Sequence, residues 1–174
     1  EACRQEAPGV VFHNCGSSEG YGRPEENPIT ERTPMNPLSP YAHSKVGADA
    51  FAGMYANAYK MRVVRTRAFT HSGPRRGRVF FDSDFCWQIV QMERGLQEKV
   101  LHVGNLTSVR TVCDVRDMVR AYRLAVDKCT PGVPYNVAGD EVWSVGDVVE
   151  QLRATASVKF DVHVDLRRLR PADA

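Results

Sequence analysis

Short apolar runs alternate along the chain with longer segments in which apolar residues recur every three or four positions. Residues 10–15 are followed by a glycine, and residues 63–69 combine two valines, a threonine and a phenylalanine with two arginines; both runs predict strands. Between them, Ser39 and Pro40 predict a helix start, because serine is a preferred N-cap and proline favours the first helical position. The apolar stripe that carries this helix to about residue 60 consists of Ala48, Phe51, Ala52, Tyr55 and Tyr59.

The same alternation continues to the end of the chain. Polar segments rich in proline and glycine predict loops at residues 22–38 and 71–79. The remaining elements are helices over residues 80–96, 114–128 and 144–156, and strands over residues 100–103, 134–138 and 159–164. Strands that alternate with helices are typical of an α/β domain with a mainly parallel sheet.

Composition narrows the class of protein without identifying it. A chain of 174 residues with 43% hydrophobic and 25% charged residues suits one soluble domain or part of a larger one. The net charge of +2 is spread along the sequence, so we expect no binding to nucleic acid or to a membrane surface. No apolar run approaches the roughly 18 residues needed to span a bilayer.

Cysteine and histidine usage favours a cytoplasmic protein without a metal site. The five cysteines are scattered with no Cys-x-x-Cys pair, and the first residues show no signal-peptide pattern, so we expect reduced thiols. The five histidines show no metal-ligand spacing.

The candidate chemistry lies between Ser17 and Lys45. Tyr41 and Lys45 are four positions apart at the predicted helix start, so their side chains share one face. An ammonium near a phenol lowers the phenol's pKa from about 10, which would make Tyr41 a usable base toward a hydroxyl whose carbon gives up hydride. Ser17 ends the preceding strand, where parallel sheets place their chemistry, and Glu19 could serve as a second acid or base. Alone, Tyr-x-x-x-Lys usually marks a solvated helix face. Together with Ser17, Glu19 and the Ser39-Pro40 helix start, the catalytic interpretation becomes the stronger one.

Longer motifs around these residues resemble a known family. Residues 16–22 (Gly-Ser-Ser-Glu-Gly-Tyr-Gly) and 39–45 (Ser-Pro-Tyr-Ala-His-Ser-Lys) are similar to the extended short-chain dehydrogenase/reductase family of nucleotide-sugar enzymes. Pro-Arg-Arg-Gly at 74–77 and Val-Gly-Asn-Leu at 103–106 most resemble the GDP-mannose 4,6-dehydratases, with the GDP-4-keto-6-deoxymannose reductases close behind. The resemblance covers nearly the whole chain, and the order of the motifs is more specific than any single motif.

The resemblance implies an α/β fold, namely part of a doubly wound Rossmann-type parallel sheet with a smaller substrate-binding subdomain. Residues 1–70 would form the later half of the Rossmann-type domain, and residues 71–174 would mix substrate-subdomain elements with returning Rossmann strands and stop short of the family's last helices. No Gly-x-x-Gly-x-x-Gly loop is present, so we expect that the half with the dinucleotide phosphate cradle is missing from this chain. Since that would expose an apolar parallel edge, the isolated chain is expected to be unstable or to aggregate.

In that family, Ser17, Tyr41 and Lys45 would form the catalytic triad, with NADP or NAD as cofactor. Tyr41 would take the proton of the sugar 4-hydroxyl while C4 passes hydride to the nicotinamide, and Lys45 would also hold the nicotinamide ribose. In the dehydratases, Glu19 would remove the C5 proton before the 6-hydroxyl leaves as water and hydride returns to C6.

The resemblance also implies residues that bind cofactor and substrate. His71 and Arg76 fall on the cofactor side, with Arg76 in a loop that reaches cofactor at a subunit interface. Arginine forks suit phosphate oxygens, so the nucleotide diphosphate of the substrate would be held by arginine. The residues on the substrate side are Ser18, Asn105, Arg110 and Arg170. For each arginine a surface salt bridge, and for Asn105 a turn cap, is the alternative.

Three departures from the family pattern bear on the substrate contacts. Thr70 stands where the family usually has asparagine, Thr111 stands where aspartate is usual, and Val112-Cys113 replaces the usual aromatic-Thr pair. The order of the motifs still favours a GDP-mannose 4,6-dehydratase-like enzyme, a homo-oligomer when full length. Two alternatives stay open. One is a reductase or epimerase of the same family, and the other is a non-catalytic, degenerate copy of the fold.

Overall fold

The computed structural model describes residues 1–169 of the chain, which divides into two compact units. The first unit joins Glu1–His71 to Cys113–Gly139, and the second joins Ser72–Val112 to the segment from Asp140 onward. The sequence predicts a boundary between the two domains after residue 70. In the structure the first unit also includes Cys113–Gly139, a segment that the sequence-based prediction assigns to the second, mixed part of the chain.

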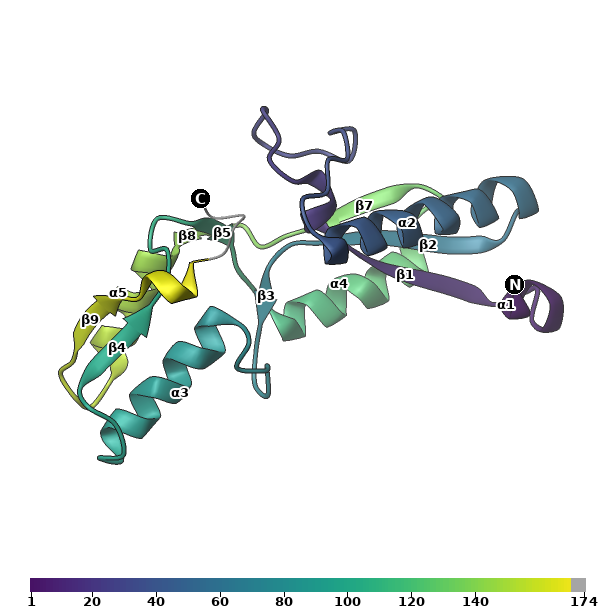
Figure 1. The fold of residues 1–174 in the computed structure, drawn as a ribbon. Helices are drawn as coiled ribbons and strands as arrows, with labels where there is room; N and C mark the ends of the chain where they lie inside the picture. Colours follow the sequence, from purple (N-terminus) through teal and green to yellow (C-terminus); the bar gives the residue numbers. More distant parts are fainter. Residues whose placement is uncertain (170–174) are drawn as a thin grey trace. The chain divides into compact units, whose positions relative to one another are not determined.

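The first unit is built on a three-stranded parallel sheet in the order β1 (Val11–Ser17), β2 (Arg62–Ala68) and β7 (Pro134–Val137). The register pairs Ser17 with Ala68, so the carboxyl ends of β1 and β2 lie at one edge of the sheet (Figure 1). The predicted α/β fold with a parallel sheet is confirmed.

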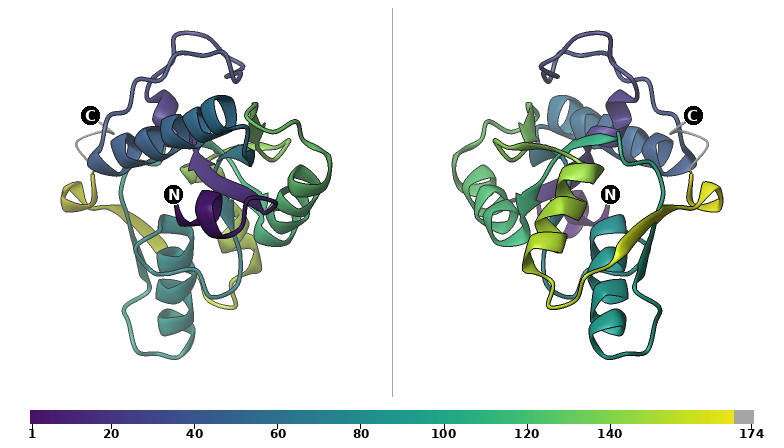
Figure 2. Two further views of the ribbon diagram at one scale, coloured as in Figure 1. Left: turned by 90° about the vertical axis from the view of Figure 1, so that its right-hand side faces the viewer. Right: turned by 90° about the vertical axis from the view of Figure 1, so that its left-hand side faces the viewer.

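Two helices cover this sheet on opposite faces, α2 (Pro40–Tyr59) on one and α4 (Val115–Lys128) on the other (Figures 1 and 2). Strand alternation explains the division, because successive side chains of β2 point to opposite faces. Arg65 and Arg67 face α2, whereas Thr66 hydrogen-bonds His13, whose ring lies 4.8 Å from that of Tyr122 on α4. The apolar contact between α2 and β2 includes Ala52, Ala56, Met61 and Val63.

Helix α2 begins where the sequence predicts. The Ser39 hydroxyl accepts a hydrogen bond from the Ala42 amide at 3.1 Å, and Pro40 occupies the first helical position. The helix ends at Tyr59, and its C-cap, Lys60, adopts a left-handed backbone conformation.

The second unit contains a helix, α3 (Phe81–Glu93), and a parallel strand pair, β4 (Val100–Val103) with β9 (Asp161–Val164). An antiparallel pair, β5 (Val109–Thr111) with β8 (Val142–Ser144), leads into α5 (Val145–Thr155). The capping box predicted for α5 is present between Ser144 and Asp147. The core of this unit consists of Phe85, Ile89, Met92, Leu101, Val103, Val145, Val149 and Phe160.

The elements that the sequence did not predict are short. Besides β5 and β8 they are α1 (Ala2–Glu6), η1 (Ser18–Tyr21), β3 (His71–Ser72), β6 (Cys113–Asp114) and η2 (Leu166–Arg168). All five cysteines are free thiols, and Cys15 and Cys86 are exposed. Within residues 1–169, none of the helices has the length and apolar character of a membrane span.

Candidate active site

The end of β1 positions the first two candidate residues, Ser17 and Glu19. A Cβ at Gly16 would lie 2.6 Å from the Thr66 carbonyl oxygen, so glycine lets the end of β1 approach β2 closely. Ser17 then caps the 3-10 turn η1, because its hydroxyl accepts a hydrogen bond from the Glu19 amide at 3.2 Å. The Glu19 side chain is exposed, and its carboxylate has no hydrogen-bond or ion-pair partner in the described part of the chain.

The first turns of α2 position the other two, Tyr41 and Lys45. The Lys45 ammonium donates a hydrogen bond to the carbonyl oxygen of Cys15 on β1 at 3.1 Å, and it lies 5.7 Å from the centroid of the Tyr41 ring. Tyr41 is 54% exposed, so its ring is open to a ligand from solvent. Lys45 thus ties α2 to the strand that ends at Ser17, and the four candidate catalytic residues come from adjoining elements of one unit.

The turn that carries Glu19 is packed tightly against α2 and the following loop. A Cβ at Gly20 would lie 2.9 Å from Cγ2 of Val46, the residue after Lys45, and 3.0 Å from the sulfur of Met35. The Asn36 amide donates to the Gly20 carbonyl oxygen at 2.9 Å. Gly22, which ends the turn, has φ of +65°, and a Cβ there would lie 1.9 Å from the Asn36 carbonyl oxygen. The path of the backbone past Glu19 is therefore narrowly defined.

Sequence reasoning missed a buried polar cluster behind these residues. Asp49, one helical turn after Lys45, is 4% exposed and accepts hydrogen bonds from Arg65 at 2.6 and 2.9 Å and from Arg67 at 2.8 and 3.2 Å. Burial alone would raise the pKa of Asp49, but the hydrogen bonds from both arginines outweigh it and hold that pKa below its usual value. Two arginines at alternate positions of an otherwise buried strand were the available signal, since such charges need a buried carboxylate.

The remaining candidates of the first unit lie close to the same elements. Ser18 follows Ser17 in η1 and is half-buried. His71 opens β3, and its Nδ1 donates to the Phe69 carbonyl oxygen at 2.9 Å, which orients the ring. Partial burial raises the pKa of the Cys15 thiol despite the nearby Lys45.

The candidates of the second unit each contact neighbours within their own segment. Arg76 forms an ion pair with Asp82 at 3.1 Å, and Asn105 accepts hydrogen bonds from the amide and hydroxyl of Thr107, both at 2.8 Å. Arg110 is exposed on β5 and donates to the Val109 carbonyl oxygen at 2.7 Å. Arg170 lies outside the described residues, and the substrate roles of all these side chains stay predictions.

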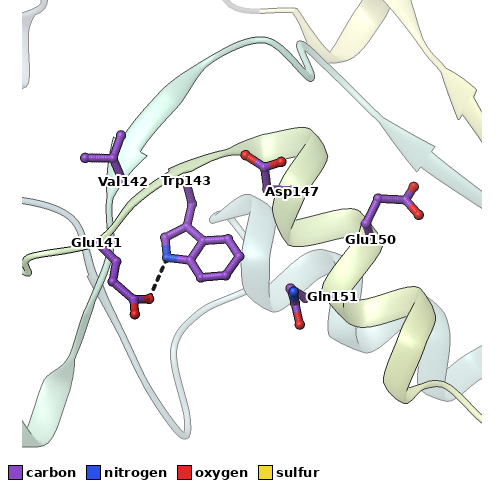
Figure 3. A pocket seen from close by; sticks show the side chains of 6 residues that line it. All are labelled: Glu141, Val142, Trp143, Asp147, Glu150 and Gln151. Carbon is purple, nitrogen blue, oxygen red and sulfur yellow. Dashed lines mark hydrogen bonds between the residues drawn. The ribbon is translucent and has the colours of Figure 1, made fainter.

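The second unit also has an open hollow of about 410 Å³ that contains none of the candidates. It is lined by Glu141, Val142, Trp143, Asp147, Glu150 and Gln151 (Figure 3). The Trp143 ring nitrogen donates to the Glu141 carboxylate at 3.0 Å. Three carboxylates would repel a nucleotide diphosphate, so this hollow does not fit the predicted substrate.

A parallel sheet whose strand ends at a serine, with a Tyr-x-x-x-Lys helix anchored beside it, defines the short-chain dehydrogenase/reductase class of proteins. Comparison with known sequences agrees. The sequence model of the family described as GDP-mannose 4,6 dehydratase matches residues 1–172, and the chain belongs to this family.

Among the individual relatives, some are named as reductases and others as dehydratases. Over 94% of its length, the chain is 31% identical to the GDP-6-deoxy-D-mannose reductase of Pseudomonas aeruginosa, covering 54% of that protein. Over a similar share, it is 32% identical to GDP-mannose 4,6 dehydratase 2 of Arabidopsis thaliana, covering 44% of that protein. The solved structure of RMD from Pseudomonas aeruginosa complexed with NADPH superposes with a TM-score of 0.91 at 29% identity, covering 97% of this chain and 58% of that one. The chain thus spans about half the length of these relatives.

The residues of this chain fit one end of a nicotinamide dinucleotide. Lys45 is held by a backbone carbonyl beside an exposed phenol, which suits the ribose hydroxyls next to a nicotinamide ring. The sequence has no glycine-rich loop for the pyrophosphate, so the fit extends only to the nicotinamide end.

Proposed function

We propose that this chain carries the catalytic residues of a nucleotide-sugar 4,6-dehydratase that converts GDP-mannose to GDP-4-keto-6-deoxymannose. The observation that carries the proposal is the place of Glu19, two residues after the strand-ending Ser17: its carboxylate is exposed and has no partner among residues 1–169. A carboxylate in that position is needed to remove a carbon-bound proton, whereas simple reduction of a ketone does not need it.

The other residues of the site act on the sugar 4-hydroxyl. Tyr41 takes the hydroxyl proton, Ser17 hydrogen-bonds the same oxygen, and the Lys45 ammonium stabilises the phenolate. When bound, NADP or NAD would supply the acceptor for the hydride from C4 and the donor of the hydride to C6.

The elimination step assigns Glu19 its role. The new C4 ketone acidifies the C5 hydrogen, and the Glu19 carboxylate accepts that proton. The electron pair of the C5–H bond becomes the second bond between C5 and C6 while the C6–O bond breaks, and the hydroxyl leaves as water with the proton that Glu19 accepted. When hydride reaches C6, C5 takes up the second released proton, the one that Tyr41 removed from the 4-hydroxyl, so the net change is the loss of one water molecule.

The substrate, the partners and the location are proposals of the same kind. Arg110 and Arg170 would bind the diphosphate of GDP-mannose, with Ser18 and Asn105 on the sugar side, and His71 and Arg76 would contact the cofactor. The protein would act in the cytoplasm as a homo-oligomer, without nucleic acid or membrane partners.

The rival proposal is a GDP-4-keto-6-deoxymannose reductase that uses the same serine, tyrosine and lysine. The TM-score of 0.91 to the NADPH complex from Pseudomonas aeruginosa, together with 31% identity to that organism's reductase, favours it. The two proposals differ in whether Glu19 takes part in the chemistry.

The test uses the protein with its native flanking sequence. It is mixed with GDP-mannose and NADP, and the sugar C6 is followed by NMR. We expect the hydroxymethyl group to become a methyl group without net NADPH, and Glu19→Gln to abolish this conversion. Reduction of a supplied 4-keto sugar by NADPH, with no conversion of GDP-mannose, would replace the dehydratase by the reductase.

A further inference from the structure

Buried side chains join the helix that carries Tyr41 and Lys45 to the turn that carries Glu19. Asp49 lies on α2 one turn after Lys45, and its carboxylate accepts two hydrogen bonds from Arg67. A third nitrogen of the same guanidinium group, Nη1, donates to the Tyr21 hydroxyl at 2.9 Å. Tyr21 is only two residues after Glu19, so three side chains in succession connect the two parts of the candidate site.

The Tyr21 hydroxyl is held in one orientation. It accepts from Arg67 and donates to Oδ1 of Asn136 on β7 at 2.7 Å, and the residue is 1% exposed. Asn136 in turn binds the loop before α2, because its side-chain amide donates to the Ile29 carbonyl oxygen at 3.3 Å and its backbone amide to the Glu31 carboxylate at 2.7 Å. The hydroxyl therefore lies where turn, strand β7 and loop meet.

The tight packing of Gly20 against Val46 and Met35 is an independent sign that this turn is set against α2. Packing fixes how near the turn approaches the helix, whereas the Tyr21 hydroxyl is directional and fixes how the turn is rotated. Rotation of the turn determines where the Glu19 carboxylate points.

We propose that Tyr21 is a positioning residue, whose hydroxyl, bound by Arg67 and Asn136, holds the turn so that Glu19 points at the same sugar as Tyr41. The inference rests on the proposed function, because it concerns the removal of the C5 proton. Tyr21 is too buried to touch a substrate, so it acts through Glu19. Its loss therefore slows proton transfer at C5 and leaves binding and hydride transfer at C4 nearly unchanged.

The test is Tyr21→Phe in the protein with its native flanking sequence. This variant removes one oxygen, keeps the ring, and leaves the bonds between Asp49 and Arg67 in place. The matched control is Tyr59→Phe, which removes the same oxygen from an exposed residue at the far end of α2. Dehydration is measured with ordinary GDP-mannose and with GDP-mannose deuterated at C5 or at C4.

We expect kcat of Tyr21→Phe to fall about 10- to 100-fold, as for a misplaced catalytic group, with KM nearly constant. The isotope effect from C5 deuterium should rise, because proton removal becomes slower than the other steps, while that from C4 deuterium should fall. A merely structural loss would lower the amount of active enzyme and leave both isotope effects at their wild-type values.

The outcomes separate this inference from the proposed function. A wild-type enzyme that dehydrates GDP-mannose and a Tyr21→Phe variant with unchanged isotope effects would overturn the inference alone. A wild-type enzyme that forms no methyl product would overturn the proposed function, and the inference with it. Equal changes in Tyr59→Phe would also overturn the inference, since that hydroxyl has no link to the turn.

Discussion

Each unit contains one aspartate that binds two arginines, but water reaches the two groups to very different degrees. In the first unit Asp49 binds Arg65 and Arg67, whose side chains are 13% and 8% exposed. In the second unit Asp84 binds Arg78 at 3.5 Å and Arg168 at 2.7 Å, whose side chains are 54% and 42% exposed. The aspartate is therefore buried in both units, whereas its arginine partners are buried in the first unit and about half exposed in the second.

This difference in exposure should change both the stability that each cluster contributes and how firmly it fixes the side chains around it. Removing one partner of a buried group leaves charges without water or protein contacts, whereas exposed arginines are rehydrated at little cost. A buried group also has one permitted arrangement, which suits it to hold Lys45 and Glu19 in place. In the group around Asp84, two exposed arginines join a surface loop and the end of the described chain to the buried carboxylate on α3.

Of the substitutions that test this comparison, Asp49→Asn is expected to lower the free energy of unfolding most. The change leaves the two buried guanidinium groups without their counter-charge, so the free energy of unfolding should fall by about 3–5 kcal/mol. The measurement is urea unfolding of the protein with its native flanking sequence. A loss no larger than that of the same change at Asp84 would show that the arginines find other partners.

The sequence was informative where an element is long enough to repeat its pattern. Helices α2 and α4 and strand β2 were predicted within one or two residues, whereas β5, β8 and the turn η1 are shorter than the pattern that would reveal them. Their existence depends on tertiary contacts, such as the hydrogen bond from the Asn36 amide to the Gly20 carbonyl oxygen.

The site shows the same division. Tyr41, Lys45 and Ser17 lie in local motifs, so their types and spacing were enough to single them out. The contacts of Arg67 span 18 positions to Asp49 and 46 to Tyr21, and no local pattern encodes partners that far apart. The arginines of β2 were visible in the sequence, but their partners were not.

The second largest effect is the response of Asp49 to acid. Since the folded-state pKa of Asp49 lies below its usual value of 3.8, the group stabilises the fold above that pH and the contribution is lost as pH falls through the folded-state pKa. Urea unfolding between pH 5 and pH 2 should therefore show a declining free energy of unfolding. In Asp49→Asn this part of the decline should be missing, and an unchanged slope would contradict the assignment.

A smaller effect is expected from Asp84→Asn in the second unit. Its two arginines are half solvated, and asparagine can still accept the 2.8 Å hydrogen bond from Gln88, so the loss should be about 1–2 kcal/mol. Added salt should lower the wild-type stability toward that of the variant, because exposed charges are screened. A loss as large as that of Asp49→Asn would mean that exposure is the wrong measure of difference between the two groups.

The smallest effects are expected from changing two helix N-caps, each a serine whose hydroxyl accepts a hydrogen bond from a backbone amide. Ser39 caps α2 through the Ala42 amide at 3.1 Å, and Ser144 caps α5 through the Asp147 amide at 3.0 Å. Ser39→Ala should lower the free energy of unfolding by about 1 kcal/mol, and Ser144→Ala should cost a comparable amount.

The effects of the two variants on dehydration should differ, because the first turn of α2 carries Tyr41 and that of α5 carries no candidate residue. We therefore expect Ser39→Ala to lower kcat several-fold at a temperature where both variants are fully folded, and Ser144→Ala to leave kcat unchanged. Equal activities would mean that the anchor from Lys45 to Cys15 holds the start of α2 without its cap.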